Sequence, residues 1–148
     1  MKIDDLDRKI IQKLMANSRN SFRAIAKSLN ISVATAISRV NKMEKEGIIK
    51  NYSANIDYEK LGYDITAIIE IIVSKGKLVE IEEKLAKYPS VLGVYDITGE
   101  TDAVIITRFK NRKELNSFVK SLLAMQNVER TNTHFVLNVV KEDFRMHV

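Results

Sequence analysis

The sequence contains no cysteine, and its 148 residues include a single proline, Pro89. Without cysteine the chain can form neither a disulfide nor a thiolate metal site, and this composition fits a reducing compartment such as the cytosol. Glycine is also scarce, with five residues, and no glycine-rich phosphate-binding loop is present. The composition therefore excludes disulfide scaffolds, thiolate metal centres and glycine-rich nucleotide loops.

Long apolar stretches are missing as well. The most apolar stretch, Ile65–Val73, contains Thr66 and Glu70. It is far shorter than the roughly 20 residues that a membrane-spanning helix requires. No charged-then-apolar leader opens the chain, so we expect no signal peptide. These features indicate a chain that neither spans a membrane nor is secreted.

What the sequence does contain is enough apolar side chain for a packed core, together with an uneven distribution of charge. Hydrophobic residues make up 45% of the chain, which is typical of a globular protein, and the formal net charge is +5. Residues 1–60 hold twelve Lys or Arg against seven Asp or Glu, whereas residues 61–148 hold twelve of each sign. The excess positive charge in the first half indicates an anionic partner, and double-stranded DNA is the first candidate.

The first half has the pattern of short amphipathic helices separated by polar breaks. Asp4 or Asp5 can cap a first helix, and Ser21 is a good N-cap for a second. Asn30 suits the left-handed conformation that ends a helix and begins a tight turn. The apolar positions expected to face inward from these two helices are Leu6, Ile10, Leu14, Phe22, Ile25, Ala26 and Leu29.

A third helix should begin after Ser32, which is its expected N-cap. Apolar residues recur along it at steps of four and three, which predicts one buried stripe with Ala36 at its edge. Gly47 is expected to end the helix, and residues 48–52 to form a short extended wing. The members of the predicted buried stripe are Val33, Ile37, Val40 and Met43.

A helix pair of this kind could place the third helix in the major groove and present its first turns to base edges. Arg39 could pair with a guanine or a phosphate, while other cations would set the register along the backbone. The alternative is an ordinary three-helix bundle with a solvated polar face. The candidate DNA contacts are Arg19, Phe22, Arg23, Lys27, Ser32, Ala34, Thr35, Ser38, Arg39, Lys42 and Lys50.

The second half has a different pattern of elements. Residues 57–63 are a polar connector with a turn at Gly62, so we divide the chain into residues 1–56, a linker over 57–63, and residues 64–148. The order after the linker is β-α-β-β-α-β, which is typical of a ferredoxin-like sandwich. The predicted class is therefore α+β, with an N-terminal winged helix-turn-helix domain. The expected elements are a strand over 65–74, a helix from Leu78 to Pro89, strands over 91–98 and 103–109, a helix around 115–122 and a strand over 131–140.

A ferredoxin-like domain covers only one face of its sheet with helices. Several of the expected strands are apolar on both faces, so the uncovered face must be buried against something. Pairing of the sheets of two copies is the simplest solution and gives a two-fold homodimer. A dimer also suits paired helix-turn-helix units, which contact half-sites about one DNA turn apart.

Six patches of residues, in order along the chain, match one known family. They are Ile3-Asp4 with Asp7, Ile10-Ile11 and Leu14; Asn17 and Arg19; Arg39-Val40, Met43-Glu44 and Gly47-Ile48-Ile49; Leu61-Gly62; Pro89, Val91, Val94-Tyr95, Thr98-Gly99 and Asp102; and Val128, Arg130-Thr131, Thr133, Val136-Leu137 and Lys141. Together they resemble the Lrp/AsnC, or feast/famine, family of transcriptional regulators. The resemblance covers nearly the whole chain.

The resemblance implies a sequence-specific DNA-binding regulator whose C-terminal domain forms homodimers that assemble into tetramers or octamers. It also implies a small effector, usually an amino acid, with contacts that would fall on Gly99, Asp102, Thr131 and Thr133 of this chain. Asp102 could pair with an ammonium group, and N–H groups near Gly99 could hold a carboxylate. The alternative is a plain hairpin turn in which Gly99 supplies a positive φ and Asp102 caps the backbone.

The alternative functions are an architectural DNA-binding protein and an enzyme. An architectural, chromatin-like protein that wraps DNA with little sequence preference would use the same basic half and the same assembly. An enzyme is not expected, because His134 and His147 are isolated and no nucleophile, base and orienting group occur together. No cofactor or metal is expected beyond the possible amino-acid effector. A regulator of this kind would be cytoplasmic and associated with the nucleoid.

Overall fold

The computed structural model describes residues 2–146, which form two compact units. The first unit contains the chain up to Asn55 together with the residues from Glu142 onward, and the second unit is the chain in between. The predicted linker, residues 57–63, lies at the start of the second unit, and the predicted domain 64–148 includes a tail that the structure groups with the first unit. No helix within the described range is long and apolar enough to span a bilayer.

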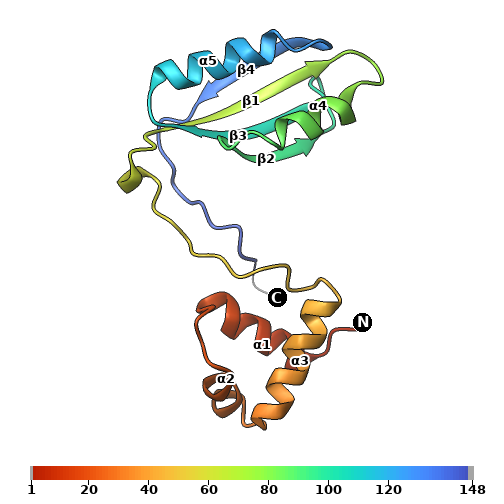
Figure 1. Ribbon diagram of the computed structural model, residues 1–148, viewed down its shortest axis with the longest axis vertical. Coiled ribbons are helices and arrows are strands. Elements are labelled where there is room, and N and C mark those ends of the chain that lie inside the picture. The colour runs from red at the N-terminus through yellow and green to blue at the C-terminus, as the bar shows by residue number, and fades with distance from the viewer. Residues whose placement is uncertain (1, 147–148) are drawn as a thin grey trace. The chain divides into compact units, whose positions relative to one another are not determined.

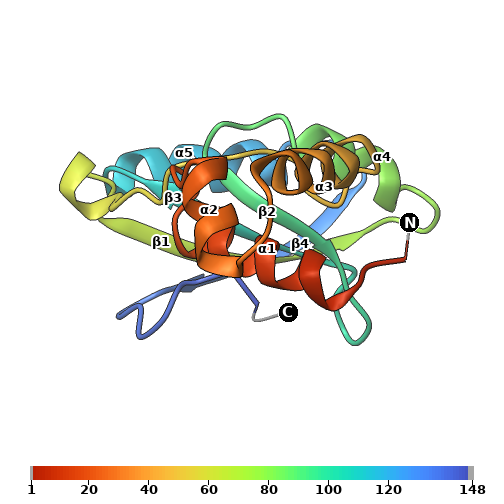
Figure 2. The same ribbon diagram turned by 90° about the horizontal axis from the view of Figure 1, so that it is seen from below.

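The first unit is built from three helices that pack on one another (Figure 1, Figure 2). A reciprocal capping box starts the first helix. The N–H of Asp7 donates to Asp4 at 2.9 Å, and the N–H of Asp4 donates to Asp7 at 3.1 Å. Such caps satisfy N–H groups that have no partner inside the helix. The helices are α1 (Asp5–Ala16), α2 (Phe22–Leu29) and α3 (Val33–Lys45).

A tight turn joins α2 to α3. Asn30 takes the left-handed conformation, with φ of 54°, which Asn tolerates better than most residues. The N–H of Ile31 donates to the carbonyl of Ala26 at 3.0 Å and closes the turn. Ser32 then caps α3, because its hydroxyl accepts from the N–H of Thr35 at 3.0 Å. The helix-turn-helix predicted from the sequence is therefore present.

The buried side of α3 differs from the predicted stripe. Ala36, Val40 and Met43 are fully buried in the first unit. The prediction that Val33 and Ile37 share this stripe is wrong, because these residues are 40% and 37% exposed. At about 100° per residue, Ile37 lies roughly 100° from Ala36 around the helix, so the stripe centred on the smaller residue leaves Ile37 outside.

Backbone hydrogen bonds from the residues that follow α3 cap its C-terminal end. Gly47 has φ of 70°, a conformation that favours glycine. The N–H groups of Ile48 and Ile49 both donate to the carbonyl of Met43, at 2.9 and 3.2 Å. Glycine therefore ends the helix region as expected, one residue after the cap Glu46.

The predicted wing over residues 48–52 does not form a strand, and the described chain contains no strand before Ile65. Instead, the hydroxyl of Tyr52 donates to the carboxylate of Glu44 at 2.7 Å, which attaches this segment to α3. Burial and the neighbouring Glu44 carboxylate raise the pKa of Tyr52 to about 12. The segment is thus an extended connector held by a side-chain contact.

The second unit has the β-α-β-β-α-β order that the sequence predicts, which confirms the ferredoxin-like fold. A short 3-10 helix, η1 (Glu59–Leu61), precedes it and ends at Gly62, where φ is 81°. The remaining elements are β1 (Ile65–Val73), α4 (Leu78–Leu85), β2 (Val91–Asp96), β3 (Ala103–Phe109), α5 (Arg112–Leu123) and β4 (Val128–Phe135).

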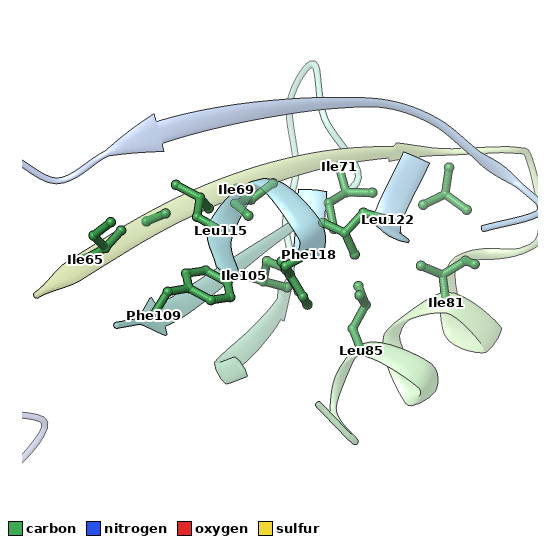
Figure 3. Packing of buried hydrophobic residues seen from close by; sticks show 12 residues of the cluster. Ile65, Ile69, Ile71, Ile81, Leu85, Ile105, Phe109, Leu115, Phe118 and Leu122 are labelled. Carbon is green, nitrogen blue, oxygen red and sulfur yellow. The ribbon is translucent and has the colours of Figure 1, made fainter. Parts of the chain in front are cut away.

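The sheet of the second unit is antiparallel, with strand order β2-β3-β1-β4. Both α4 and α5 cover the same face, and alternate residues of the central strand β1 point to them (Figure 1, Figure 3). Period-two alternation explains why every second residue of this strand is buried. The large buried side chains of this core are Ile65, Ile69, Ile71, Ile81, Leu85, Ile105, Phe109, Leu115, Phe118 and Leu122.

The last strand starts and ends earlier than predicted. The sequence favoured residues 131–140, but β4 begins at Val128 and ends at Phe135. The N–H of Val136 still donates to the carbonyl of Thr66, at 3.0 Å, but β1 begins one residue before that partner. The register would place Leu137 opposite Ile65, the first residue of β1, so residues after Leu137 have no β1 residue to pair with. Leu137 itself is 92% exposed.

The face of the sheet away from the helices is called the open face below. It carries apolar side chains that one chain leaves partly exposed, such as Ile68 at 36% and Tyr95 at 46%. Arg108 also lies on this face, with its guanidinium 4.8 Å from the ring centre of Tyr58. The residues that the strand register places on the open face are Thr66, Ile68, Glu70, Ile72, Gly93, Tyr95, Val104, Ile106, Arg108, Arg130, Asn132 and His134.

Candidate nucleic-acid interface and effector region

The outward face of α3 is small and polar near its N-terminus. Ala34 and Ser38 are exposed there, as the sequence predicts for residues that contact DNA. Ser32 is exposed too, but its hydroxyl is engaged in the helix cap and lies 2.8 Å from the hydroxyl of Thr35. Thr35 is half-buried, so it is less accessible than the other three. Small side chains on this face allow the helix to lie close to the base edges in a DNA groove.

Exposed cations occur on α2 and α3 and on the segments that flank these helices. Arg23 and Lys27 are exposed and one helical turn apart on α2, and Lys42 is exposed on α3. Arg19 before α2 and Lys50 after α3 are exposed as well. Cations around a polar helix face are the arrangement that phosphate contacts require, and they set the orientation of a helix in the groove.

Phe22 belongs to the core of the first unit. It is half-buried and packs against the buried cluster that includes Ile25 and Val40. Its prediction as a DNA contact therefore has no geometric support, and the structure gives it a packing role at the start of α2. An aromatic ring in this position follows the apolar periodicity of the helix.

Arg39 is the predicted DNA contact whose surroundings differ most from expectation. Its Nη1 donates to the carboxylate of Asp4 and lies 3.1 Å from Oδ1 of Asp7. The Asp7 side chain is fully buried, whereas the Arg39 side chain is 34% exposed. The N–H of Asp7 and then the Arg39 guanidinium hold the pKa of Asp4 below its usual value. Arg39 thus joins α3 to α1, and its guanidinium is engaged by two carboxylates.

Sequence reasoning missed three residues on the exposed face of α3. Val33 and Ile37 were assigned to the core, and Asn41 was not assigned at all, yet all three are exposed. They follow one another at intervals of four residues, which places them along one side of the helix. For Arg39, the sequence did hold a signal of its structural role, namely the acidic residues Asp4 and Asp7 at the start of α1. A buried carboxylate needs a cation, and Arg39 is the cation that contacts both.

Two of the predicted effector residues, Asp102 and Thr131, lie on either side of the C-terminal end of β1. Asp102 accepts a hydrogen bond from the N–H of Val73 at 2.8 Å, and its own N–H donates to the carbonyl of Ile71 at 3.0 Å. Gly99 has φ of 132°, as a glycine-specific turn requires. On the other side of β1, Thr131 is the register partner of Ile71.

The carboxylate of Asp102 is therefore already used to end β1. This agrees with the alternative in which Asp102 caps the backbone of a hairpin turn. Thr133 lies two residues further along β4, opposite Ile69, and is exposed. The turn residues and Thr131 come close to the same end of β1, whereas Thr133 lies further in.

A separate polar cluster lies on the open face. The amide of Asn132 donates to Glu70 at 3.0 Å, and Nε2 of His134 lies 3.2 Å from the same carboxylate oxygen. These two contacts, His134 first and Asn132 second, hold the pKa of Glu70 below its usual value. Within residues 2–146, no group of three or more His, Asp or Glu is placed to hold a metal ion.

Two family models match the chain and together span most of it. Residues 3–50 match a winged helix-turn-helix DNA-binding domain, and residues 66–146 match the Lrp/AsnC ligand binding domain. The chain belongs to the Lrp/AsnC family. The resemblance identified from the residues is therefore confirmed, and this Lrp/AsnC protein is a transcriptional regulator with a helix-turn-helix domain and a ligand-binding domain.

Curated relatives match this Lrp/AsnC protein over nearly full length. An uncharacterized HTH-type transcriptional regulator of Pyrococcus abyssi is 50% identical over 97% of this chain and 98% of its own. The HTH-type transcriptional regulator FL11 of Pyrococcus furiosus is 38% identical over 99% of this chain and 97% of its own. These relatives are named as regulators and not as enzymes, which supports the expectation that this family member is not an enzyme.

Solved structures of the family share the fold. AsnC of Escherichia coli has a TM-score of 0.89 with 28% identity, and the match covers 97% of both chains. A transcriptional regulator of Neisseria meningitidis, determined as a complex with L-Met, has a TM-score of 0.90 with 26% identity. That match covers 98% of this chain and 96% of the Neisseria chain.

Proposed function

We propose that this Lrp/AsnC protein is a sequence-specific regulator that contacts double-stranded DNA through the exposed face of α3. The observation that carries the proposal is that the small polar residues of α3 and the cations of α2 and α3 are all exposed on two helices that pack on each other. Ala34 and Ser38 offer a close-approaching surface, and Arg23, Lys27 and Lys42 would contact phosphates on either side. Arg19 and Lys50 are exposed as well and would add phosphate contacts, whereas Arg39 holds α3 against α1.

The protein acts as a homodimer that assembles further into tetramers or octamers. The open face of the sheet supports this part of the proposal, because apolar side chains such as Ile68 and Tyr95 remain partly exposed on it. Burial of such a face against a second copy gives a two-fold interface. A dimer would place two copies of α3 on half-sites about one DNA turn apart.

An amino acid modulates the DNA binding of this protein. The match to a ligand-binding domain and the L-Met complex of the Neisseria relative support this proposal. In this chain the backbone near Gly99 and the hydroxyls of Thr131 and Thr133 would contact the effector. Asp102 would position the turn, since its carboxylate already accepts a hydrogen bond from Val73. We place the protein in the cytoplasm, on the nucleoid.

DNase footprinting on genomic DNA upstream of its own gene tests the proposal, at physiological salt and with each of the common amino acids. Discrete footprints spaced by about one helical turn are the expected result. A change in one footprint with a single amino acid would identify the effector. Uniform coverage without preferred sites would instead favour the architectural function, in which the protein wraps DNA with little sequence preference.

A further inference from the structure

Apolar side chains interrupt the polar face of α3 at two positions. Val33 is 40% exposed and Ile37 is 37% exposed, and they are one helical turn apart. Each could have been buried had the helix been rotated by a fraction of a turn, but Ala36, Val40 and Met43 occupy the core side. A pair of β-branched apolar residues on an otherwise polar helix face indicates a partner with matching apolar groups.

The charges around this pair indicate that the partner is DNA. Lys42 is exposed on α3, and Arg23 and Lys27 are exposed on α2, so an approaching surface must be anionic at its edges. In the major groove the apolar group available to a side chain is the C5-methyl group of thymine. Phosphates on both sides of the groove would meet the cations while that methyl group meets Ile37.

The same helix lacks a free guanine-reading group in its first turns. The only arginine of α3 is Arg39, and its guanidinium is held by Asp4 and Asp7. Guanine is most often read by arginine or lysine, which form two hydrogen bonds with its O6 and N7 atoms. The lysines of α3, Lys42 and Lys45, lie in its last turn.

The next residue at an interval of four, after Val33 and Ile37, carries an amide. Asn41 follows Ile37 by one turn and is exposed. An asparagine amide matches the N6 and N7 atoms of adenine and forms two hydrogen bonds with them. Val33 to Asn41 spans about 12 Å along the helix axis, which corresponds to roughly four base pairs.

From these observations we propose that α3 reads A·T base pairs by two chemical signals. Ile37, supported by Ala34 and Val33, packs on thymine methyl groups, and Asn41 forms a bidentate contact with adenine. This inference rests on the proposed function, because it requires α3 in the major groove. It adds which residues distinguish the bases and which atoms of the bases they recognise.

The test begins with the full-length protein and a library of random DNA duplexes, from which bound sequences are selected. Each thymine of the selected half-site is then replaced by deoxyuridine, which differs only by the missing methyl group. At one or more positions this replacement should weaken binding by about fourfold, the effect expected for one buried methyl group. Replacement of the contacted adenine by 7-deazaadenine, which lacks N7, should weaken binding by a similar or larger factor.

Variants then assign each signal to a side chain. In Ile37→Ala the deoxyuridine penalty should disappear, because the methyl group has lost its partner. In Asn41→Ala the 7-deazaadenine penalty should disappear while the deoxyuridine penalty remains. Lys27→Ala is the matched control: it should weaken binding to all sequences alike and leave both penalties unchanged. Both helix substitutions are at exposed positions and favour helix formation, so circular dichroism should show intact variants.

The outcomes separate this inference from the proposed function. A selected motif whose binding ignores deoxyuridine at every thymine would overturn the inference and leave the regulator intact. An unchanged deoxyuridine penalty in Ile37→Ala would also overturn it. A change in the oligomeric state of Ile37→Ala would overturn it too, because Ile37 would then contact another protein chain and not DNA. A library without any enriched sequence would overturn both.

Discussion

Arg39 of α3 lies 3.1 Å from Asp7 of α1, and this ion pair fixes the two helices to each other. Asp7 exposes none of its side chain, and its carboxylate contacts Arg39 and the N–H of Asp4 in the capping box. A buried carboxylate that loses its cation is costly, which makes the pair a condition for the folded helix-turn-helix. Arg39, which the sequence predicts as a base contact, therefore forms a structural ion pair between α3 and α1.

Replacement of Asp7 by Ala should destabilise the first unit. The change removes the side-chain acceptor for the N–H of Asp4 and leaves the Arg39 guanidinium with one partner fewer, so the free energy of unfolding should fall by about 1–3 kcal/mol. Urea unfolding followed by circular dichroism measures the loss. Asp5→Ala, at an exposed position of the same helix, is the control and should change stability by much less. Equal effects of the two variants would contradict the structural role of Asp7.

Replacement of Arg39 by Lys should separate a structural role from a base contact. A lysine keeps the charge near Asp7 but loses the forked geometry, so stability should fall and overall DNA affinity with it. The order of preference among DNA sequences should stay the same, because the guanidinium of Arg39 is engaged by two carboxylates. Binding to a panel of single-base variants of the operator measures that order. If the variant lost its preference at one G·C pair, Arg39 would contact that base pair directly.

Asp102 offers a test of whether its charge or its hydrogen bond matters. Asn retains a side-chain oxygen that can accept from the N–H of Val73, whereas Ala leaves that donor without its partner. Asp102→Ala should therefore cost about 1–2 kcal/mol of stability, and Asp102→Asn much less. If the turn is only positioned by Asp102, the Asn variant should keep its response to the effector. A stable Asn variant without that response would assign the charge to ligand binding.

Acid should weaken the polar cluster of the open face. The folded state lowers the pKa of Glu70, through His134 first and Asn132 second. A group with a lowered pKa stabilises the fold above its unfolded value, 4.5 here, and this contribution is lost as the pH falls through the folded value. The stability difference between wild type and Glu70→Gln should therefore be present near neutral pH and vanish in that acidic range. Thermal unfolding across pH values measures it, and a difference independent of pH would contradict the pairing.

A charge on the open face should prevent dimer formation. Ile68 is 36% exposed there, and an aspartate at this position would place unpaired charge inside a sheet-to-sheet interface. Sedimentation of Ile68→Asp should give a monomer. Val79, which is 67% exposed on α4, provides a control, since Val79→Asp adds the same charge away from the open face. A dimeric Ile68→Asp protein would locate the interface elsewhere.

Local signals in the sequence were sufficient for most of the fold. The capping residues Ser21 and Ser32, the left-handed Asn30 and the period-two pattern of β1 each specify structure through contacts with near neighbours. The order of elements then follows from the spacing of turns and helices. These features were predicted correctly because propensity, capping and periodicity agree with one another.

The predictions that were wrong concern features that depend on contacts between distant parts of the chain. Ile37 and Ala36 compete for the same core, and only the packing of α1 and α2 decides that the smaller one is buried. The end of β4, at Phe135, depends on where β1 begins, at Ile65, seventy residues earlier. Arg39 has a partner 32 residues away, so no local pattern reveals that its charge is committed.

The register of β1 with β4 also orders events during synthesis of the chain. Ile71 pairs with Thr131, so the central strand keeps one unpaired edge until the ribosome has made nearly the whole protein. Contacts among α1, α2 and α3 span far shorter stretches and can form as soon as those helices emerge. A nascent chain that stalls before Val128 would therefore carry a formed helix-turn-helix beside an incomplete sheet whose apolar edge is open to aggregation.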